Sequence, residues 1–223
     1  MRKLVYYVAV SLDGQIAAAD GDFSAFSAEG DHMEVILRDY TDALPGPALA
    51  ALGLKPGGSR FDTVVMGWNT YAVGLPQLPD PYPHLRTFVF SRSHAPSTGR
   101  STPATAEDPQ TVASEAQVAV TAEDPVIVTA EDPVEVVRRL KDEPDGSSIW
   151  LCGGGRLAGV ILDEIDELIL KVNPIVLGAG IPLVEVAGTT PAPARGPLGA
   201  FDLVASTPFA SGVLINRYVR SSA

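Results

Sequence analysis

The sequence is short of cysteine, histidine and basic residues, and it has no long apolar run. A single cysteine, Cys152, excludes an internal disulfide and a structural zinc site built on cysteines. The histidines, His32, His84 and His94, show no metal-ligand spacing, so we expect no metal. No apolar stretch approaches the roughly 18 residues that cross a bilayer, and the stretch at 4–10 is short for a signal peptide. We therefore expect a cytoplasmic protein with no membrane partner.

Positive charge is also scarce, because 16 Lys and Arg face 27 Asp and Glu and leave a net charge of −11. No Lys/Arg run is longer than two residues, so a nucleic-acid partner is not expected. A small anionic ligand stays compatible with this balance, since one arginine and one helix N-terminus can hold a phosphate. The chain has 223 residues, 46% of them hydrophobic, which suits a globular protein with a sizeable core.

Apolar runs separated by turn residues predict strands that alternate with helices. The expected strands are 4–10, 63–66, 86–90, 148–152 and 167–172, followed by a terminal hairpin of 201–206 and 213–219. The expected helices are 31–44, 48–52, 69–74, 134–141 and 156–164. Loops are expected at 11–30 and, as a loop or insertion, at about 94–130. The pattern predicts one α/β domain over 1–223, a mixed, mostly parallel sheet flanked by helices with an antiparallel C-terminal hairpin.

The segment Thr-Ala-Glu-Asp-Pro occurs at 105–109, 121–125 and 129–133. The last copy has a local explanation: Asp132 as N-cap and Glu135 three residues later form a capping-box pattern that opens a helix. We assign no function to the other two copies.

Three predicted strand ends carry residues that suit a phosphate. The strongest signal is Gly153-Gly154-Gly155 between a strand and a helix, where the missing Cβ atoms let a phosphate reach the backbone. A tight turn without a ligand is the alternative. Gly67 lies at a second strand-to-helix junction, and Ser91-Arg92-Ser93 ends a third strand. Together they fit the rule that open α/β sheets bind ligands at the carboxyl ends of their strands.

The order of these motifs resembles that of dihydrofolate reductases. The segments that carry the resemblance are Val-Ala-Val-Ser-Leu-Asp-Gly-Gln-Ile-Ala at 8–17, Met-Gly-Trp-Asn-Thr-Tyr at 66–71, Ser-Arg-Ser at 91–93 and Cys-Gly-Gly-Gly-Arg-Leu at 152–157. The form of 11–17, together with Pro174 to Leu183, is most similar to the reductase domain of bacterial riboflavin biosynthesis and its stand-alone relatives. The resemblance covers most of the chain outside 94–130.

The resemblance implies a dihydrofolate reductase-like fold, NADPH as cofactor and a homodimer. By position, Ala9 and Ile16 would line the nicotinamide site, and Gly67 and Thr70 would meet the cofactor phosphates. Ser91 and Arg92 would hold the 2′-phosphate, and Gly153, Gly154 and Gly155 the pyrophosphate. The family's arginine after the first glycine is Trp68 here, which leaves Arg92 to carry that charge. The implied activity is hydride transfer to a small heterocyclic (pterin-, flavin- or pyrimidine-like) or carbonyl substrate.

The sequence offers Asp31 as a candidate proton donor. Asp31 stands where folate reductases place a carboxylate that assists protonation, and plain helix N-capping is the favoured alternative. A catalytic Asp31 should be buried and have a raised pKa. Trp68 and the uncertain acid motivate a second reading, a non-catalytic nucleotide-binding protein that keeps the reductase fold. Cys152, at a strand end, is expected to be a small buried hydrophobe rather than a nucleophile.

Overall fold

The structure is a computed structural model, and it describes residues 1–95, 126–186 and 199–221. Most of the expected 94–130 loop and the first two Thr-Ala-Glu-Asp-Pro segments lie outside the described residues. None of the helices in the described residues is both long and apolar enough to cross a membrane.

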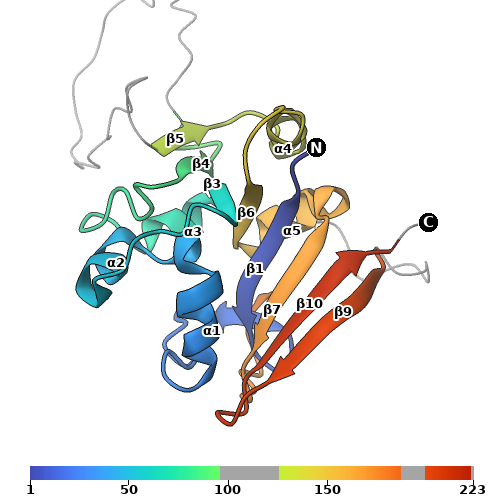
Figure 1. The fold of residues 1–223 in the computed structure, drawn as a ribbon. Coiled ribbons are helices and arrows are strands. Elements are labelled where there is room, and N and C mark those ends of the chain that lie inside the picture. Colours follow the sequence, from blue (N-terminus) through green and yellow to red (C-terminus); the bar gives the residue numbers. More distant parts are fainter. Residues whose placement is uncertain (96–125, 187–198, 222–223) are drawn as a thin grey trace, which may run out of the picture.

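Eight strands form one sheet in the order β5-β4-β3-β6-β1-β7-β10-β9 (Figure 1). They are β1 Leu4–Val10, β3 Phe61–Gly67, β4 Arg86–Phe90, β5 Val126–Thr129, β6 Ser148–Gly153, β7 Glu167–Val172, β9 Phe201–Pro208 and β10 Leu214–Arg220. Pairing is parallel from β5 to β7, whereas β10 is antiparallel to both β7 and β9. The expected mixed, mostly parallel sheet with an antiparallel C-terminal hairpin is confirmed.

Three short strands were not expected. Two of them, β2 Gln15–Ala18 and β8 Gly180–Pro182, pair antiparallel in a small separate sheet. The third, β5, lies inside the stretch expected as a loop at 94–130, so that expectation is wrong for residues 126–129. All three strands have only three or four residues, too few to show an alternating pattern in sequence.

The helices differ from expectation mainly in where they end. They are α1 His32–Asp39, α2 Gly46–Leu52, α3 Trp68–Ala72, α4 Pro133–Lys141 and α5 Gly155–Val160. The expected helix at 31–44 stops at Tyr40 and is followed by a 3₁₀ turn, because the buried Asp42 carboxylate accepts backbone N–H groups of Gly58, Arg60 and Phe61. The α4 cap agrees with prediction, since the Asp132 carboxylate accepts N–H groups from Val134 and Glu135.

The sheet separates two apolar layers, because successive side chains of a strand point to opposite faces. On one face, residues of α1 and α3 pack with Val5, Val64, Met66 and Trp150. On the other face, α4 and α5 pack with Leu4, Tyr6, Val65, Ile149 and Leu151. This three-layer arrangement leaves the carboxyl ends of β4, β3, β6 and β1 side by side along one edge.

Candidate functional site

The predicted phosphate-binding segments meet at the carboxyl ends of β4, β3 and β6. Gly67 at the end of β3 is in register with Phe90 of β4, the residue before Ser91. Met66 is in register with Gly153 of β6. Segments far apart in the sequence are therefore adjacent in space, as the sheet rule predicts.

The turn Gly153-Gly154 leaves open space where most residues would carry a side chain. Both glycines have positive φ, +148° and +92°, which favours glycine in these positions. A Cβ built on Gly153 would meet nothing within 4 Å, and one on Gly154 would meet only the Thr70 hydroxyl, at 3.4 Å. Thr70 on α3 thus borders the turn. The turn therefore has open Cβ positions beside a hydroxyl group, while Gly153 is buried and Gly154 half-buried.

Gly155 differs from its two neighbours because it is required by packing. A Cβ on Gly155 would lie 2.1 Å from the carbonyl oxygen of Pro182, and one on Gly159 would lie 2.0 Å from that of Glu185. The amide of Glu185 donates a 2.8 Å hydrogen bond to the Gly155 carbonyl. The segment 182–186 therefore lies directly against α5. This close packing explains why residue 155 is a glycine, which the sequence alone did not reveal.

The end of β4 presents a charged and polar group of side chains. Arg92 is exposed and forms no ion pair with any described residue. Ser91 is buried, and its hydroxyl lies 3.0 Å from Nδ1 of His94. The His94 ring stacks on Trp68 of α3, with the ring centroids 3.8 Å apart and the planes within 4°. Sequence reasoning did not find His94, because it looked for metal spacing only.

The expected nicotinamide residues lie on β1 and β2, beside the glycine turn. Ala9 is in the β1 strand next to β6 and shares a face with Tyr7. Ile16 lies in β2, whose Gln15 pairs with Pro182, the residue packed against Gly155. The small β2–β8 sheet thus connects these two parts of the candidate site.

Asp13 fixes the loop that joins β1 to β2. Its carboxylate accepts hydrogen bonds from the Ser11 hydroxyl at 2.6 Å and from the amides of Leu177 and Gly178 at 3.1 and 2.8 Å. The bond from Ser11, followed by those from the amides, lowers the pKa of Asp13. Hydrogen bonds to Asp13 therefore join the Ser-Leu-Asp-Gly motif to the 174–183 motif, so Asp13 has a structural role.

Asp31 lies at the start of α1, and its carboxylate contacts the β9–β10 connection. It makes no side-chain cap hydrogen bond, so N-capping is wrong. Its exposed carboxylate instead accepts the amides of Ala210, at 2.6 Å, and Ser211, at 3.1 Å, in the β9–β10 connection. The Ala210 amide is the main cause of a lowered pKa at Asp31. The burial and raised pKa that we required of a catalytic Asp31 are both absent, so it is a poor proton donor near neutral pH.

Asp80 differs from Asp31 in the direction of its pKa shift. Burial raises the pKa of Asp80, and its Oδ1 is buried without a hydrogen-bond partner among the described residues. In the part of the chain that the structure describes, it is the carboxyl group whose pKa clearly rises, whereas the resolved shifts of Asp13, Asp22, Asp31, Asp39 and Glu143 are downward. It precedes Tyr82 in the loop before β4.

An aromatic cluster of Tyr7, Tyr40, Tyr82 and Trp150 lies on the same face as Ala9. Tyr7 stacks on Tyr40 with a centroid distance of 4.5 Å, and Tyr82 meets Trp150 edge to face at 5.0 Å. Cys152 lies beside the cluster, 3.9 Å from the Tyr82 hydroxyl. Burial raises the pKa of the Cys152 thiol to about 12. The thiol therefore stays protonated near neutral pH, which fits its expected role as a small hydrophobe.

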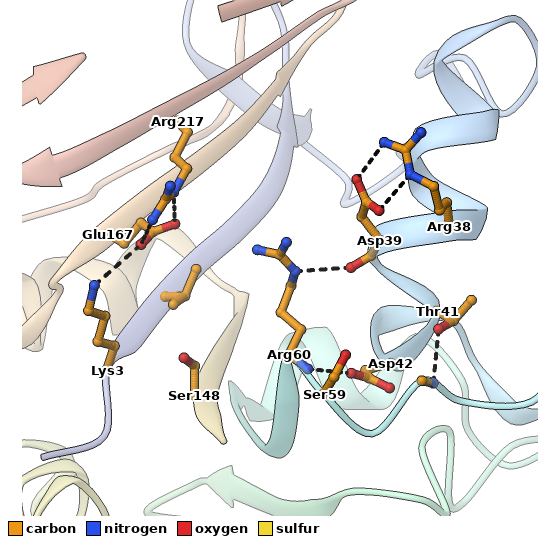
Figure 2. Close-up of a pocket in the computed structure, with 12 residues that line it drawn as sticks. Lys3, Arg38, Asp39, Thr41, Asp42, Ser59, Arg60, Ser148, Glu167 and Arg217 are labelled. Carbon is orange, nitrogen blue, oxygen red and sulfur yellow. Dashed lines mark hydrogen bonds and ion pairs between the residues drawn. The ribbon is translucent and has the colours of Figure 1, made fainter. Parts of the chain in front are cut away.

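A separate cavity of about 450 Å³ lies at the starts of β1, β6 and β7, at the opposite ends of these strands from the glycine turn. Its charges are largely paired: Glu167 binds Arg217 at 2.5 and 3.0 Å, and Asp39 binds Arg38 at 2.8 Å. Figure 2 shows the Arg60 guanidinium between these two ion pairs. Arg60 donates to the Asp39 carbonyl and stacks over Tyr40. These contacts hold the end of α1 against the sheet.

No group of three or more His, Cys, Asp or Glu side chains in the described residues is arranged to hold a metal ion.

The sheet order is that of a dihydrofolate reductase-like protein. An Enterococcus faecalis dihydrofolate reductase complexed with NADP(H) is similar in structure, with a TM-score of 0.55 at 13% identity over 99% of this chain and 97% of that one. A putative riboflavin biosynthesis protein of Shewanella sp. PV-4 gives 0.60 at 21% identity and covers both chains fully. These likenesses establish the fold.

The family follows from the sequence as a whole. The model of the RibD C-terminal domain matches residues 2–215, and the chain belongs to this family. It is 34% identical over 189 residues to the uncharacterized Bacillus subtilis protein YwjB, covering 82% of each. The Thermotoga maritima diaminohydroxyphosphoribosylaminopyrimidine deaminase/5-amino-6-(5-phosphoribosylamino)uracil reductase gives a TM-score of 0.58 at 16% identity, and this chain spans 57% of its length.

Proposed function

We propose that this protein is an NADPH-dependent reductase that delivers a hydride to a small heterocyclic or carbonyl substrate. The observation that carries the proposal is the edge formed by the ends of β4, β3 and β6. There Arg92, which pairs with no described carboxylate, the Thr70 hydroxyl and the open Gly153-Gly154 turn follow strands that are adjacent in the sheet. The family supports it, since the reductase from Thermotoga maritima and the NADP(H)-complexed dihydrofolate reductase share the fold.

The chain's residues fit a dinucleotide phosphate along this edge. The Gly153-Gly154 turn offers backbone that a pyrophosphate can approach, because a Cβ at either position would occupy open space. Gly67 offers the same opening at the end of β3. Arg92 would meet the 2′-phosphate, since a guanidinium forms paired charge-assisted hydrogen bonds with such a group. The buried Ser91 hydroxyl, which the resemblance also assigns to this phosphate, is engaged with His94.

The nicotinamide end would lie between β1 and the β2–β8 sheet, beside Ala9 and Ile16. When bound, NADPH supplies the hydride, so the protein's part is to hold donor and acceptor together. The small side chain of Ala9 leaves room on the face that carries the aromatic cluster. Tyr7 and Tyr82 are only half-buried there and offer ring faces to a planar substrate. A pterin-, flavin- or pyrimidine-like acceptor fits such a surface.

The proton that accompanies hydride transfer needs a donor other than Asp31. Asp80 has the raised pKa that a donor needs, but it lies in the loop before the start of β4 and interacts with His84, so no contact places it at the nicotinamide end. We therefore assign no side chain of the described residues to this step.

A non-catalytic nucleotide-binding protein is the second candidate. It is favoured by Trp68 at the position of the family's arginine and by the exposed, acidic Asp31. It shares the cofactor edge but predicts no turnover.

Thermal unfolding with and without saturating NADPH, and then NADH, tests the proposal. At a hundredfold excess over Kd a ligand that binds only the folded state adds about 2.7 kcal/mol, or roughly 5–10 °C for a protein of this size. We expect a larger shift with NADPH than with NADH. No shift with either cofactor would make the glycine turn purely structural and overturn the proposal.

Turnover separates the two candidates. NADPH oxidation would be followed with dihydrofolate, dihydropterins, flavins and pyrimidine ribitylamines as acceptors. Robust turnover with any of them eliminates the non-catalytic reading, whereas NADPH binding without turnover favours it.

A further inference from the structure

The contact between Trp68 and His94 joins two strand ends at the proposed cofactor edge. Trp68 opens α3 directly after Gly67, and His94 follows Ser91-Arg92-Ser93 at the end of β4. Their rings are parallel within 4° and 3.8 Å apart, which is full face-to-face contact. Trp68 also meets Tyr71 edge to face at 5.6 Å, so the indole is itself held from α3. The imidazole, although exposed to solvent, is therefore held against the indole in one plane.

Hydrogen bonds determine which nitrogen of the imidazole faces outward. Nδ1 lies 3.0 Å from both the Ser91 and the Ser93 hydroxyl oxygens. The Ser91 oxygen already accepts the His94 amide at 3.1 Å, so its own O–H is free to donate to Nδ1. A neutral imidazole that accepts at Nδ1 carries its proton on Nε2. In this tautomer the Nε2–H has no partner among the described residues, and His94 lies two positions after Arg92, which pairs with no described carboxylate.

We propose that His94, held by Trp68, is a specificity-determining residue that donates from Nε2 to the 2′-phosphate of NADPH beside Arg92. This inference rests on the proposed function. It also accounts for the absence of an arginine at position 68: the tryptophan adds no charge itself but positions a second donor beside the first. Recognition then requires two residues of the β4 end, with Trp68 as a positioning residue that does not contact the phosphate.

Binding of NADPH and NADH by calorimetry tests the inference, because the two cofactors differ only in the 2′-phosphate. His94→Phe keeps a ring on Trp68 but removes the N–H. We expect it to weaken NADPH binding roughly 10-fold and to leave NADH binding within about twofold, since hydrogen bonds to charged groups are among the stronger ones. His94→Gln supplies a side-chain N–H and should restore part of the preference for NADPH.

Trp68→Leu tests the positioning role. It leaves His94 in the chain but removes the ring that holds it, so we expect a smaller loss of the NADPH preference than in His94→Phe. In a variant that already carries His94→Phe, adding Trp68→Leu should cause no further loss of this preference. His84→Phe, on a histidine remote from this edge that contacts the Asp42 carbonyl, is the matched control and should keep the wild-type preference.

The outcomes distinguish the inference from the function on which it rests. A wild-type protein that binds neither cofactor overturns both. A wild-type protein that prefers NADPH, with the preference intact in His94→Phe, overturns only the role of His94. An equal loss of NADPH and NADH in His94→Phe assigns His94 to folding or to the adenine and also rejects the inference.

Discussion

Arg92 is the residue on which the choice between NADPH and NADH chiefly depends. It is exposed at the end of β4 and pairs with no carboxylate of the described residues, so a phosphate would displace no ion pair with any of them. Arg92→Ala should cost about 1.5–3 kcal/mol of NADPH binding and much less of NADH binding. Fluorescence or calorimetric titration measures both. Arg86→Ala, at the opposite end of the same strand, is the control. Equal losses for the two cofactors would remove Arg92 from the 2′-phosphate site.

Asp31 gives a prediction about stability rather than catalysis. Its carboxylate accepts two amides of the β9–β10 connection, and these bonds lower its pKa in the folded protein. A group whose folded pKa lies below its unfolded value, about 3.9, stabilises the protein above that pH, and the contribution disappears as the pH falls through the folded pKa. Asp31→Asn should therefore lower the unfolding midpoint at pH 7, and the difference should vanish in acid.

Asp145→Asn, at an exposed position remote from the β9–β10 connection, is the control for this pH series. A difference between Asp31→Asn and wild type that stayed constant from pH 7 into acid would contradict the role of the carboxylate charge. If Asp31→Asn abolished turnover while leaving stability unchanged, the exclusion of Asp31 as a catalytic acid would be wrong.

At the scale of elements, the glycines at the ends of β3 and β6 have different tasks. Gly155 is required where α5 touches the Pro182 carbonyl, whereas Gly67 has an ordinary φ of −79° and open space at its Cβ position. Gly155→Ala should destabilise the protein by about 1–3 kcal/mol through overpacking. Gly67→Ala should leave the unfolding midpoint nearly unchanged and weaken binding of both cofactors. Denaturant unfolding and cofactor titration of the two variants measure these effects. Loss of stability in Gly67→Ala, or unchanged stability in Gly155→Ala, would contradict the different roles of the two glycines.

The elements that the sequence predicted well are long and apolar. The bounds of β1, β4 and β7 were predicted without error, because each is a continuous apolar or β-branched run between turn residues. The end of α1 was not, since apolar spacing continues to Leu44 while the buried Asp42 turns the chain toward residues 58–61. Contacts with distant segments, which have no local signal, decided that boundary.

The candidate site was predictable only in part for the same reason. Glycine and Ser-Arg-Ser motifs are visible at their strand ends, and the sheet rule brings the strand ends together. The stack of His94 on Trp68 joins residues 26 positions apart whose types suggest no pairing. The packing role of Gly155 depends on Pro182, and the pKa of Asp80 depends on burial. These properties come from tertiary structure.

On the scale of the whole molecule, the two edges of the sheet differ in length and exposure. The edge strand β9 has eight residues, nearly all exposed, including Leu203 and Val204 at 56% and 48%. Long edge strands with exposed apolar residues are templates for pairing. We propose that two copies pair antiparallel along β9, an arrangement that is self-complementary about a two-fold axis.

Val204→Lys should convert this dimer to a monomer, because it places a charge at the pairing edge. Light scattering after size-exclusion chromatography measures the mass. Ile127→Lys, on the opposite edge strand β5, introduces the same charge at a residue of similar exposure, 44%, and should leave the dimer intact. A wild-type protein that is monomeric at all concentrations would reject the proposal.

The position of β1 in the sheet also determines when, during synthesis, the proposed nucleotide site can form. This first strand lies between β6 and β7, with Leu4 opposite Ile149 and Val10 opposite Val172. Such non-local pairing slows folding, because the chain must close very long loops before the contacts repay the cost. A ribosome-bound chain that ends before β6 has neither the partners of β1 nor the glycine turn. The ability to recognise a nucleotide should therefore arise abruptly and late in synthesis, and NADPH would act on the finished fold by opposing its unfolding.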